Sequence, residues 1–341
     1  MTTQTSDLVN ILTACTKVLN LRVAQVRDGL SNEFPNKNAL RTDISHQLAI
    51  AIMAEQAEKL LSLQPESTLF GLVYHEYDYY ALIKLFLNDL VQFTTLNDID
   101  LGINLMSFGQ TRIAENSFYH LAASPLLLTT YKTIDQHAGQ VFDTYSIPFK
   151  LRLALELKLR TITGFEKYEV IKGKKTIQIS HELPFSRLLK ELQVIDCLKL
   201  PCSLANIKNI YQWACNFCHT GEKEYLWFTM KALELVSPLF IYQEQKKFEV
   251  NICEHWSIEG INEEEKIQRH ISFGVPVRPL YYLSNGWTVQ RLQDALNDAE
   301  ETKRIAALAK GHIRQTYKYS LSETNLTEIA PYYCSRTKQY F

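Results

Sequence analysis

The stretch "SIPFKLRLALELKLRTITGFEKYEVIKGKKTIQIS", residues 146–180, decides the fold because its hydrophobic period changes within one continuous segment. Its first part has the period of an amphipathic helix, with Pro148 near the start and Gly164 just beyond the end. Its second part alternates hydrophobic and polar residues on both sides of a Lys-Gly-Lys-Lys turn, which predicts a β-hairpin. The stretch therefore predicts a mainly α fold with a small β component.

The rest of the chain extends this prediction in both directions. Only 12 Gly and 10 Pro occur in 341 residues, a composition that favours long helices. We expect an N-terminal multi-helix bundle over 1–142, a central helical region with the hairpin over 143–240, and a C-terminal part over 241–341. That last part should combine a few strands, in "IYQEQKKFEVNICEHWSI" and "VPVRPLYYLS", with a long helix beginning at Trp287 or Thr288 and continuing through "AKGHIRQTY".

The overall charge limits the classes of partner. The 36 Lys and Arg residues nearly balance the 37 Asp and Glu residues, so the net charge of -1 gives no broad basic field and any RNA contact must be local. The most apolar stretches are shorter than the roughly 20 residues that span a bilayer. The polar start, Met1 to Asp7, does not resemble a secretory signal. We expect a cytoplasmic protein without a membrane partner.

Several common catalytic motifs are missing from the sequence. It contains neither Gly-x-Gly-x-x-Gly nor Gly-x4-Gly-Lys-Ser/Thr, and neither Gly-x-Ser-x-Gly nor His-Glu-x-x-His. Nucleotide hydrolysis, dinucleotide chemistry and serine hydrolysis therefore lose support. No cofactor is expected.

The segment "ACNFCHTGEKEY", residues 214–225, comes closest to carrying chemistry, because it contains Cys-x-x-Cys-His. This pattern attaches c-type haem in exported proteins. With Cys197 and Cys202, the residues Cys215 and Cys218 also approach zinc-site spacing. Cys218 at a helix C-terminus is poorly placed to be a thiolate nucleophile. We interpret the segment as a packed helix ending at Gly221, with buried thiols and no metal.

His219 is the main functional candidate in this segment. It lies in the last turn of the predicted helix, where the negative end of the helix dipole favours the protonated imidazole. Asn216 lies three residues earlier on the same face. Such a pair suits phosphate binding or acid–base chemistry. The alternative is a histidine that caps the helix carbonyls.

The helix "PFKLRLALELKLRTITGF", followed by "IYQWACNFCHTG", resembles HEPN-type domains of bacterial defence and abortive-infection systems over about residues 146–239. Active HEPN ribonucleases carry an arginine, a polar residue and, a few positions later, a histidine, which act on an RNA phosphate across two protomers without metal. His219 matches the histidine and Asn216 the polar neighbour, but Trp213 and Ala214 stand where the arginine is expected. The resemblance therefore implies a domain that binds RNA or a protein without cleaving RNA.

Other residues could supply a cation or a second site. Arg152, with Glu156 one turn later, could approach His219 from another helix or form a buried ion pair with Glu156. Arg41 and His46 in "RTDISH" have the HEPN spacing, although the segment also suits a helix cap. A third cluster comprises His75, Glu76 and Asp78, whose aromatic neighbours do not favour a metal site.

Together these observations predict a cytoplasmic helical interaction or regulatory protein of a phage-defence or toxin–antitoxin system. Its partner would be a protein or RNA, and a homodimer would follow from the HEPN resemblance. The alternative is a metal-independent HEPN-type endoribonuclease that uses His219, with Asn216, Arg152 and Glu156 as further site residues.

Overall fold

The structure is a computed structural model, and it describes part of the chain. The described residues are 3–23, 33–36, 44–63, 68–70, 72–73, 76–102, 144–172, 175–240, 283–322, 333–334 and 339–340. The strands expected between residues 241 and 258 and in 275–282 lie outside these residues, as do the predicted domain boundary at 142 and the start of the predicted C-terminal part at 241. The division into three domains thus stays a prediction.

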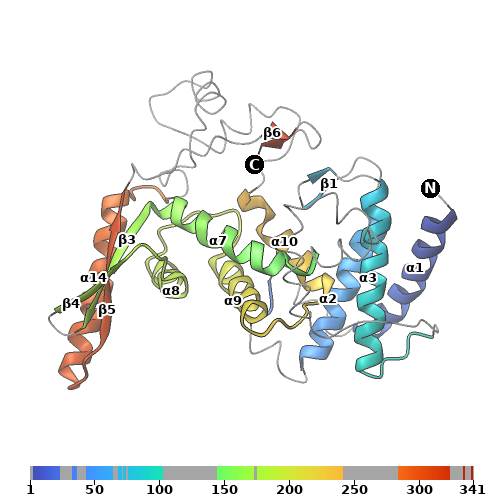
Figure 1. Cartoon of the computed structure of the whole chain (residues 1–341), viewed down its shortest axis with the longest axis horizontal. Helices are drawn as coiled ribbons and strands as arrows, with labels where there is room; N and C mark the ends of the chain where they lie inside the picture. Colours follow the sequence, from blue (N-terminus) through green and yellow to red (C-terminus); the bar gives the residue numbers. More distant parts are fainter. Residues whose placement is uncertain are drawn as a thin grey trace, which may run out of the picture. The chain divides into compact units, whose positions relative to one another are not determined.

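The fold is mainly α with a small antiparallel sheet, which confirms the predicted class (Figure 1). Its helices are α1 (Thr3–Val23), α2 (Ile44–Ser62), α3 (Glu76–Leu96), α7 (Ile147–Thr163), α8 (Phe185–Ile195), α9 (Leu204–Thr220), α10 (Leu226–Phe240) and α14 (Val289–Ala309). Its strands are β1 (Thr68–Leu69), β2 (Leu72–Val73), β3 (Phe165–Lys172), β4 (Lys175–Ser180), β5 (Gln315–Leu321), β6 (Tyr333–Cys334) and β7 (Gln339–Tyr340).

The chain divides into two compact units that are not contiguous in sequence. Unit 1 comprises Met1–Arg152 and Asn209–Ser237, and unit 2 comprises Leu153–Lys208 and Pro238–Phe341. The division falls inside α7, α9 and α10, so each of these helices contributes residues to both units.

Local capping signals explain where several helices end. Gly164 and Gly221 have φ values of 68° and 64°, a left-handed conformation that glycine adopts without strain, and they follow α7 and α9 directly. At the start of α14, the hydroxyl of Thr288 accepts a hydrogen bond from the Arg291 backbone N–H (3.1 Å). These three boundaries lie where the sequence predicts them.

The core of unit 1 lies where α1, α2 and α3 pack together with α10. Trp227 is fully buried, with its ring stacked on Tyr225 (centroids 4.6 Å apart) and in edge contact with Phe93 (5.4 Å). Other fully buried side chains come from each of these helices: Leu12, Leu19, Ile52, Met53, Ile83, Phe86, Leu90 and Ala232. The apolar periodicity of the first hundred residues is therefore that of a packed bundle.

A charged network joins α2 to α10 within unit 1. Lys231 is fully buried and donates to Glu55 Oε1 (2.8 Å), while Lys59 pairs with both Glu55 and Glu234. Gln56 Nε2 also donates to Glu234 (2.8 Å). Because two lysines face two glutamates, the burial of Lys231 leaves no uncompensated charge.

Unit 2 contains the three-stranded sheet, with the strand order β4-β3-β5 and antiparallel pairing throughout. The predicted hairpin is confirmed as β3 and β4, with Lys172 opposite Lys175 at its turn. Between the pairs Val170–Gln178 and Ile171–Thr176 the register shifts, so Ile177 is an extra residue on β4. A bulge of this kind discourages further strands from pairing with an edge strand.

The opposite edge of the sheet, formed by β5, is covered by polar side chains of α14. The backbone N–H groups of Tyr317, Tyr319 and Leu321 donate to Glu300 (3.2 Å), Asn297 (2.7 Å) and Gln293 (2.7 Å). The three acceptors are spaced three and four residues apart on one helix face, while the donors are every second residue of the strand. Helix α14 thus satisfies backbone groups that an edge strand would otherwise expose.

The C-terminal helix is shorter than predicted. The helical pattern was expected to continue through "AKGHIRQTY", but α14 ends at Ala309, Gly311 takes a φ of 71°, and residues 315–321 form β5. Ile305 and Leu308, which continue the apolar helical period of Leu292 and Leu296, are 56% and 45% exposed, and Ile313 lies beyond the helix. Pairing of the β-favouring segment "QTYKYSL" with β3 overrides the helical period.

Candidate functional site

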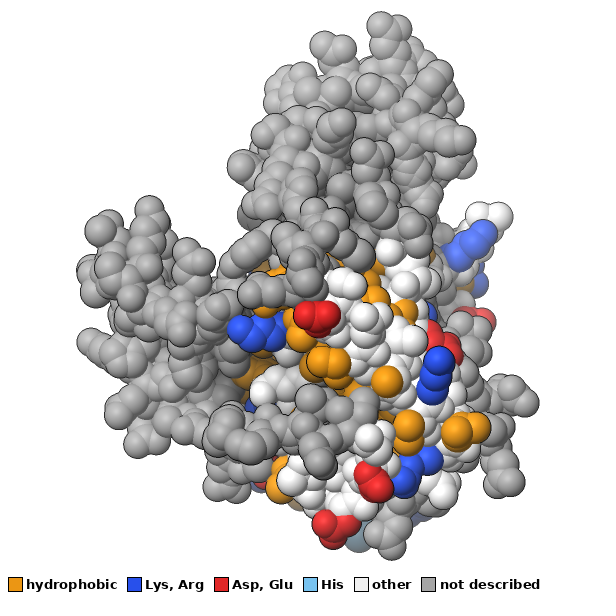
Figure 2. Space-filling view, turned by 90° about the vertical axis from the view of Figure 1, so that its right-hand side faces the viewer, with side chains coloured by type: hydrophobic (Ala, Val, Ile, Leu, Met, Phe, Trp, Pro, Cys, Tyr) orange, Lys and Arg blue, Asp and Glu red, His pale blue; other side chains and the backbone are white. Residues whose placement is uncertain are grey.

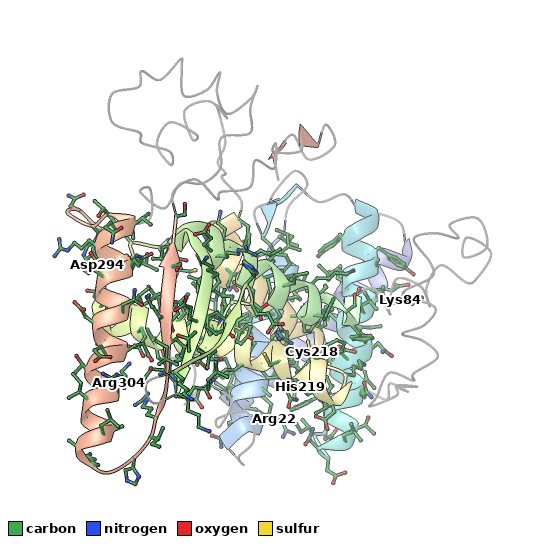
Figure 3. All side chains as sticks on the ribbon, turned by 60° about the vertical axis from the view of Figure 1, so that its left-hand side comes forward. Arg22, Lys84, Cys218, His219, Asp294 and Arg304 are labelled. Atoms are coloured by element: carbon green, nitrogen blue, oxygen red, sulfur yellow. The ribbon has the colours of Figure 1, made fainter. Side chains whose placement is uncertain are left out.

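His219 lies on the last turn of α9 with an exposed side chain (Figure 3). Its neighbours cap the helix: Thr220 Oγ1 donates to the Asn216 carbonyl (2.8 Å), and the Gly221 N–H donates to the Phe217 carbonyl (2.9 Å). The imidazole itself makes no hydrogen bond or ion pair with any residue that the structure describes. His219 is therefore open to solvent at the helix end.

Asn216 points its amide toward the turn between α9 and α10. Its Nδ2 donates to Glu222 Oε2 at 3.4 Å, near the limit of a hydrogen bond, and it also hydrogen-bonds to Glu224. Two acidic side chains therefore lie beside Asn216. Such a setting does not favour a phosphate there.

Arg152, on α7, contacts α9 far from the helix end that carries His219. Its guanidinium is 5.6 Å from the ring centroid of Tyr211, in a cation–π contact. Tyr211 and His219 are separated by two turns of α9, which corresponds to about 12 Å along the helix axis. The structure therefore places Arg152 beside Tyr211 rather than beside His219, while Glu156 lies one turn further along α7, half-buried.

The remaining predicted positions are described only in part. Arg41 and His75 lie outside the described residues. His46 lies in the first turn of α2, and Glu76 and Asp78 lie in the first turn of α3. The roles considered for these residues stay predictions.

Glu224 is a titratable group that sequence analysis did not single out. It accepts a hydrogen bond from the indole Nε1 of Trp213 (2.8 Å). Burial raises the pKa of Glu224 to about 7; hydrogen bonds from Trp213 and Asn216 lower it, and the nearby charge of Glu222 raises it further. Glu224 therefore changes its charge near neutral pH, a property that depends on burial and has no sequence signature.

A buried polar network lies beneath the same turn. Asp89 is fully buried, and its Oδ1 accepts from Lys223 Nζ (2.6 Å) and from the Tyr145 hydroxyl (2.6 Å). Its Oδ2 accepts from the backbone N–H of Leu226 at the start of α10 (2.8 Å), and Lys223 also donates to Gln92 (2.6 Å). The network ties the turn to α3, so we assign it a structural role.

The cysteines do not form a reactive or metal-binding cluster in the described residues. Burial raises the pKa of Cys197 to about 11 and that of Cys202 to about 12, so both are thiols at neutral pH. Across the described ranges, no three His, Cys, Asp or Glu side chains converge as metal ligands. Cys215 and Cys218 lie half-buried on α9.

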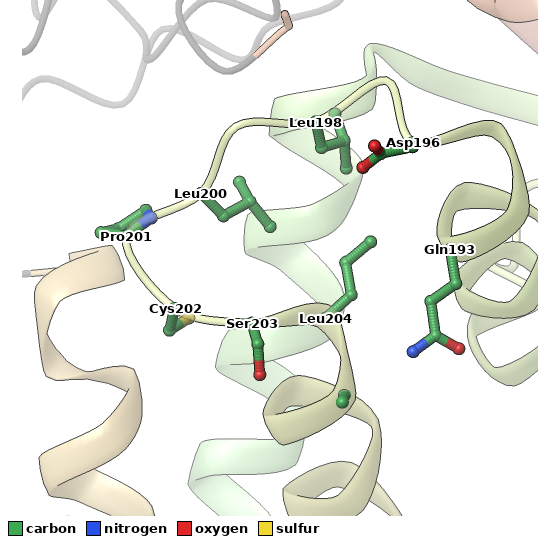
Figure 4. Close-up of a pocket in the computed structure, with 9 residues that line it drawn as sticks. Gln193, Asp196, Leu198, Leu200, Pro201, Cys202, Ser203 and Leu204 are labelled. Carbon is green, nitrogen blue, oxygen red and sulfur yellow. The ribbon is translucent and has the colours of Figure 1, made fainter. Parts of the chain in front are cut away.

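Unit 2 has an open hollow of about 540 Å³ between the end of α8 and the start of α9 (Figure 4). Polar groups of Gln193, Asp196 and Ser203 and the thiol of Cys202 lie along it, together with leucine side chains. Because burial raises the pKa of Cys202 to about 12, its thiol is not an activated nucleophile in this hollow.

A cluster of cations lies at one end of the sheet in unit 2. The exposed side chains of this cluster, which we name the basic end, are the lysines and the arginine Lys172, Lys175, Lys310 and Arg314, together with His312. Lys172 at the end of β3 is paired across the sheet with Lys175 on β4 and with Gln315 on β5, so the hairpin turn and the start of β5 adjoin. No acidic residue occurs in 170–180 or 303–318.

The basic end differs from the other cations nearby. Lys303 pairs with Glu191, Arg304 with Glu301 (2.5 Å), and Lys318 approaches Glu169 (3.9 Å). By contrast, the five side chains of the basic end have no ion pair or hydrogen bond with residues within the described ranges. The two segments that contribute, 172–175 and 310–314, are far apart in the sequence, and the β3–β5 register brings the hairpin turn beside the start of β5.

On the face of unit 1 that carries α1 and α3, basic and acidic side chains are mixed (Figure 2). Figure 2 shows lysine, arginine, aspartate and glutamate side chains interspersed over the coloured part of this face. Mixed signs of charge are typical of a solvated surface.

Comparison of the chain with protein-family models, with curated proteins and with solved structures gave no match. Among the helices of the described residues, none combines the length and apolar character needed to cross a bilayer.

Proposed function

We propose that this protein binds RNA without cleaving it, and that the basic end of unit 2 is the RNA-binding surface. The observation that supports the proposal is the set of four exposed lysine and arginine side chains that have no acidic partner among the described residues, whereas Lys303 and Arg304 are paired. Exposed lysine and arginine side chains of this kind contact the backbone phosphates of RNA.

The near-zero net charge of the chain argues for a local RNA-binding surface and against a general affinity for polyanions. With a net charge of -1, electrostatic attraction to RNA must come from a segregated patch, and the basic end is such a patch. The resemblance to HEPN-type domains also supports RNA as the partner, since the hairpin that carries Lys172 and Lys175 belongs to the HEPN-like region. The same resemblance supports a role in phage defence or in a toxin–antitoxin system, in the cytoplasm.

The test is a titration of a fluorescein-labelled RNA hairpin, followed by fluorescence anisotropy at low salt. The variant replaces four side chains of the basic end, in a combination of Lys172→Ala, Lys175→Ala, Lys310→Ala and Arg314→Ala. We expect its affinity to fall roughly tenfold or more, because each lost cation removes one phosphate contact.

The matched control has the same change in net charge at other exposed lysines. It combines Lys17→Ala, Lys84→Ala, Lys190→Ala and Lys199→Ala, on α1, on α3 (Lys84, Figure 3), on α8 and in the segment before α9. These four side chains have no ion pair in the described part of the chain. Equal loss of affinity in both variants, with equal circular dichroism spectra, would reject the basic end as the binding surface.

A second candidate function is a metal-independent HEPN-type endoribonuclease acting as a homodimer through His219. The exposure of His219 supports it, because its imidazole is open to a substrate. Incubation of structured and single-stranded RNA with wild type, His219→Ala and Arg152→Ala, with chelator present, tests it. Cleavage that the His219 substitution abolishes would establish this function over the binding role; unchanged RNA in all three reactions would remove it.

A further inference from the structure

The two lysines at the hairpin turn form an electrostatically unfavourable pair. Lys172 and Lys175 are direct cross-strand neighbours, and both side chains are exposed. Neighbouring strands are about 4.8 Å apart, and like charges directly opposite each other destabilise a sheet. An anion lying between the two ammonium groups would remove this repulsion.

The backbone that carries the rest of the basic end is ordered between the end of α14 and the start of β5. Arg314 directly precedes Gln315, the β5 partner of Lys172. The turn after α14 is ordered by hydrogen bonds from the N–H groups of Gly311 and His312 to the carbonyls of Leu308 and Ala307 (both 2.9 Å). The charges of the basic end therefore lie at the hairpin end of β3 and β4, directly before β5 and directly after α14.

Tyr317, the first aromatic residue of β5 after Arg314, is already engaged within unit 2. The guanidinium of Arg187 lies 4.3 Å from the centroid of the Tyr317 ring, and the Tyr168 ring lies 5.2 Å away. Tyr319, on the same strand, is only 1% exposed. Neither tyrosine is presented as a platform for an unpaired base.

Among the described residues, the exposed apolar side chains that lie in or next to the segments of the basic end are aliphatic. They are Ile177, Leu308 and Ile313, which are 57%, 45% and 69% exposed. Proteins that bind single-stranded nucleic acids stack successive bases on aromatic rings, and aliphatic side chains have no π-face for this purpose. Double-stranded RNA is instead recognised mainly through its shape, its phosphates and its 2′-hydroxyl groups.

We infer that the basic end binds the sugar–phosphate backbone of double-stranded RNA, without preference for sequence. The inference rests on the proposed function and specifies its ligand. The cross-strand lysine pair and the neighbouring Arg314 and Lys310 contact phosphates, while the bases stay paired inside the duplex.

The test uses the full chain and two complementary RNA strands of roughly 16 nucleotides, a length that one double-stranded-RNA-binding domain covers. Each labelled strand and the annealed duplex are titrated separately by anisotropy. We expect the duplex to bind at least fivefold more tightly than either strand. A duplex of unrelated sequence should bind with the same affinity within about twofold.

The outcomes separate this inference from the proposed function. Binding of either single strand as tightly as the duplex overturns the duplex inference and leaves RNA binding intact. Tighter binding of a DNA duplex of the same sequence overturns double-stranded RNA as the ligand. Binding of no RNA above the level of the four-site alanine variant overturns both. Loss of duplex binding in Lys172→Ala with Lys175→Ala, with single-strand binding unchanged, supports the inference.

Discussion

Asn297 on α14 forms two hydrogen bonds with the backbone of Tyr319 on β5. Its Nδ2 donates to the Tyr319 carbonyl (3.1 Å), and its Oδ1 accepts from the Tyr319 N–H (2.7 Å). The side-chain amide thus takes the place of a residue on a further strand. With Gln293 and Glu300 on the same helix face, it closes the free edge of β5, whose other edge pairs with β3.

We expect Asn297→Ala to destabilise the protein by about 2 kcal/mol, because two backbone groups of a buried strand residue lose their partner. Urea denaturation followed by circular dichroism measures the change. Asp298→Ala, an exposed neighbour on the same helix, is the control for helix propensity. Equal stabilities of the two variants would show that the edge hydrogen bonds contribute nothing.

Glu224→Gln should stabilise the protein at pH 8 and have little effect at pH 5. The pKa of Glu224 is about 7 in the folded state, above its ordinary value of 4.5, so the folded state binds more protons than the unfolded state. The contribution of Glu224 is therefore fully favourable below pH 4.5 and is lost as the pH rises through 7. The shift corresponds to at most about 3 kcal/mol.

Melting temperatures of wild type and Glu224→Gln between pH 5 and pH 8 check this prediction. The difference between the two proteins should grow as the pH rises, while Glu222→Gln, at an exposed position nearby, should leave the pH dependence of wild type largely in place. A constant difference across this range would contradict the raised pKa.

Asp89 and Lys223 should be strongly coupled. Removing one charge, in Asp89→Asn or Lys223→Met, leaves the other buried without its partner and should cost about 3 kcal/mol. The double variant should cost less than the sum of the single variants, because no unpaired charge remains. The free energies of unfolding of all four proteins, from urea titrations, give the coupling; additive losses would show that the ion pair is not a coupled unit.

Local signals made part of the fold predictable. The helix over residues 147–163, its glycine cap, the hairpin and the cap at Thr288 all depend on residues close together in sequence. Strand β5 was missed because its conformation depends on pairing with β3, far away in the chain, and because an apolar helical period continues past Gly311. Non-local pairing of this kind leaves little trace in the segment itself.

The sequence could predict where single candidate residues lie on their helices, but not which side chains surround them. The position of His219 at a helix end followed from Gly221, but the placement of Arg152 beside Tyr211 depends on how α7 packs against α9. The raised pKa of Glu224 depends on burial beside Trp213. The basic end required the sheet register, since Lys172 and Arg314 lie in separate parts of the sequence.

The salt dependence of RNA binding tests the central claim most directly. The slope of log K against log salt concentration, measured with the RNA hairpin between 50 and 200 mM salt, counts the phosphate contacts at about 0.9 each for a duplex. Replacing Lys172, Lys175, Lys310 and Arg314 by alanine should reduce the steepness of this slope by about 3 to 4, while the control at Lys17, Lys84, Lys190 and Lys199 keeps the wild-type slope. Equal slopes in wild type and the basic-end variant would contradict RNA binding at this surface.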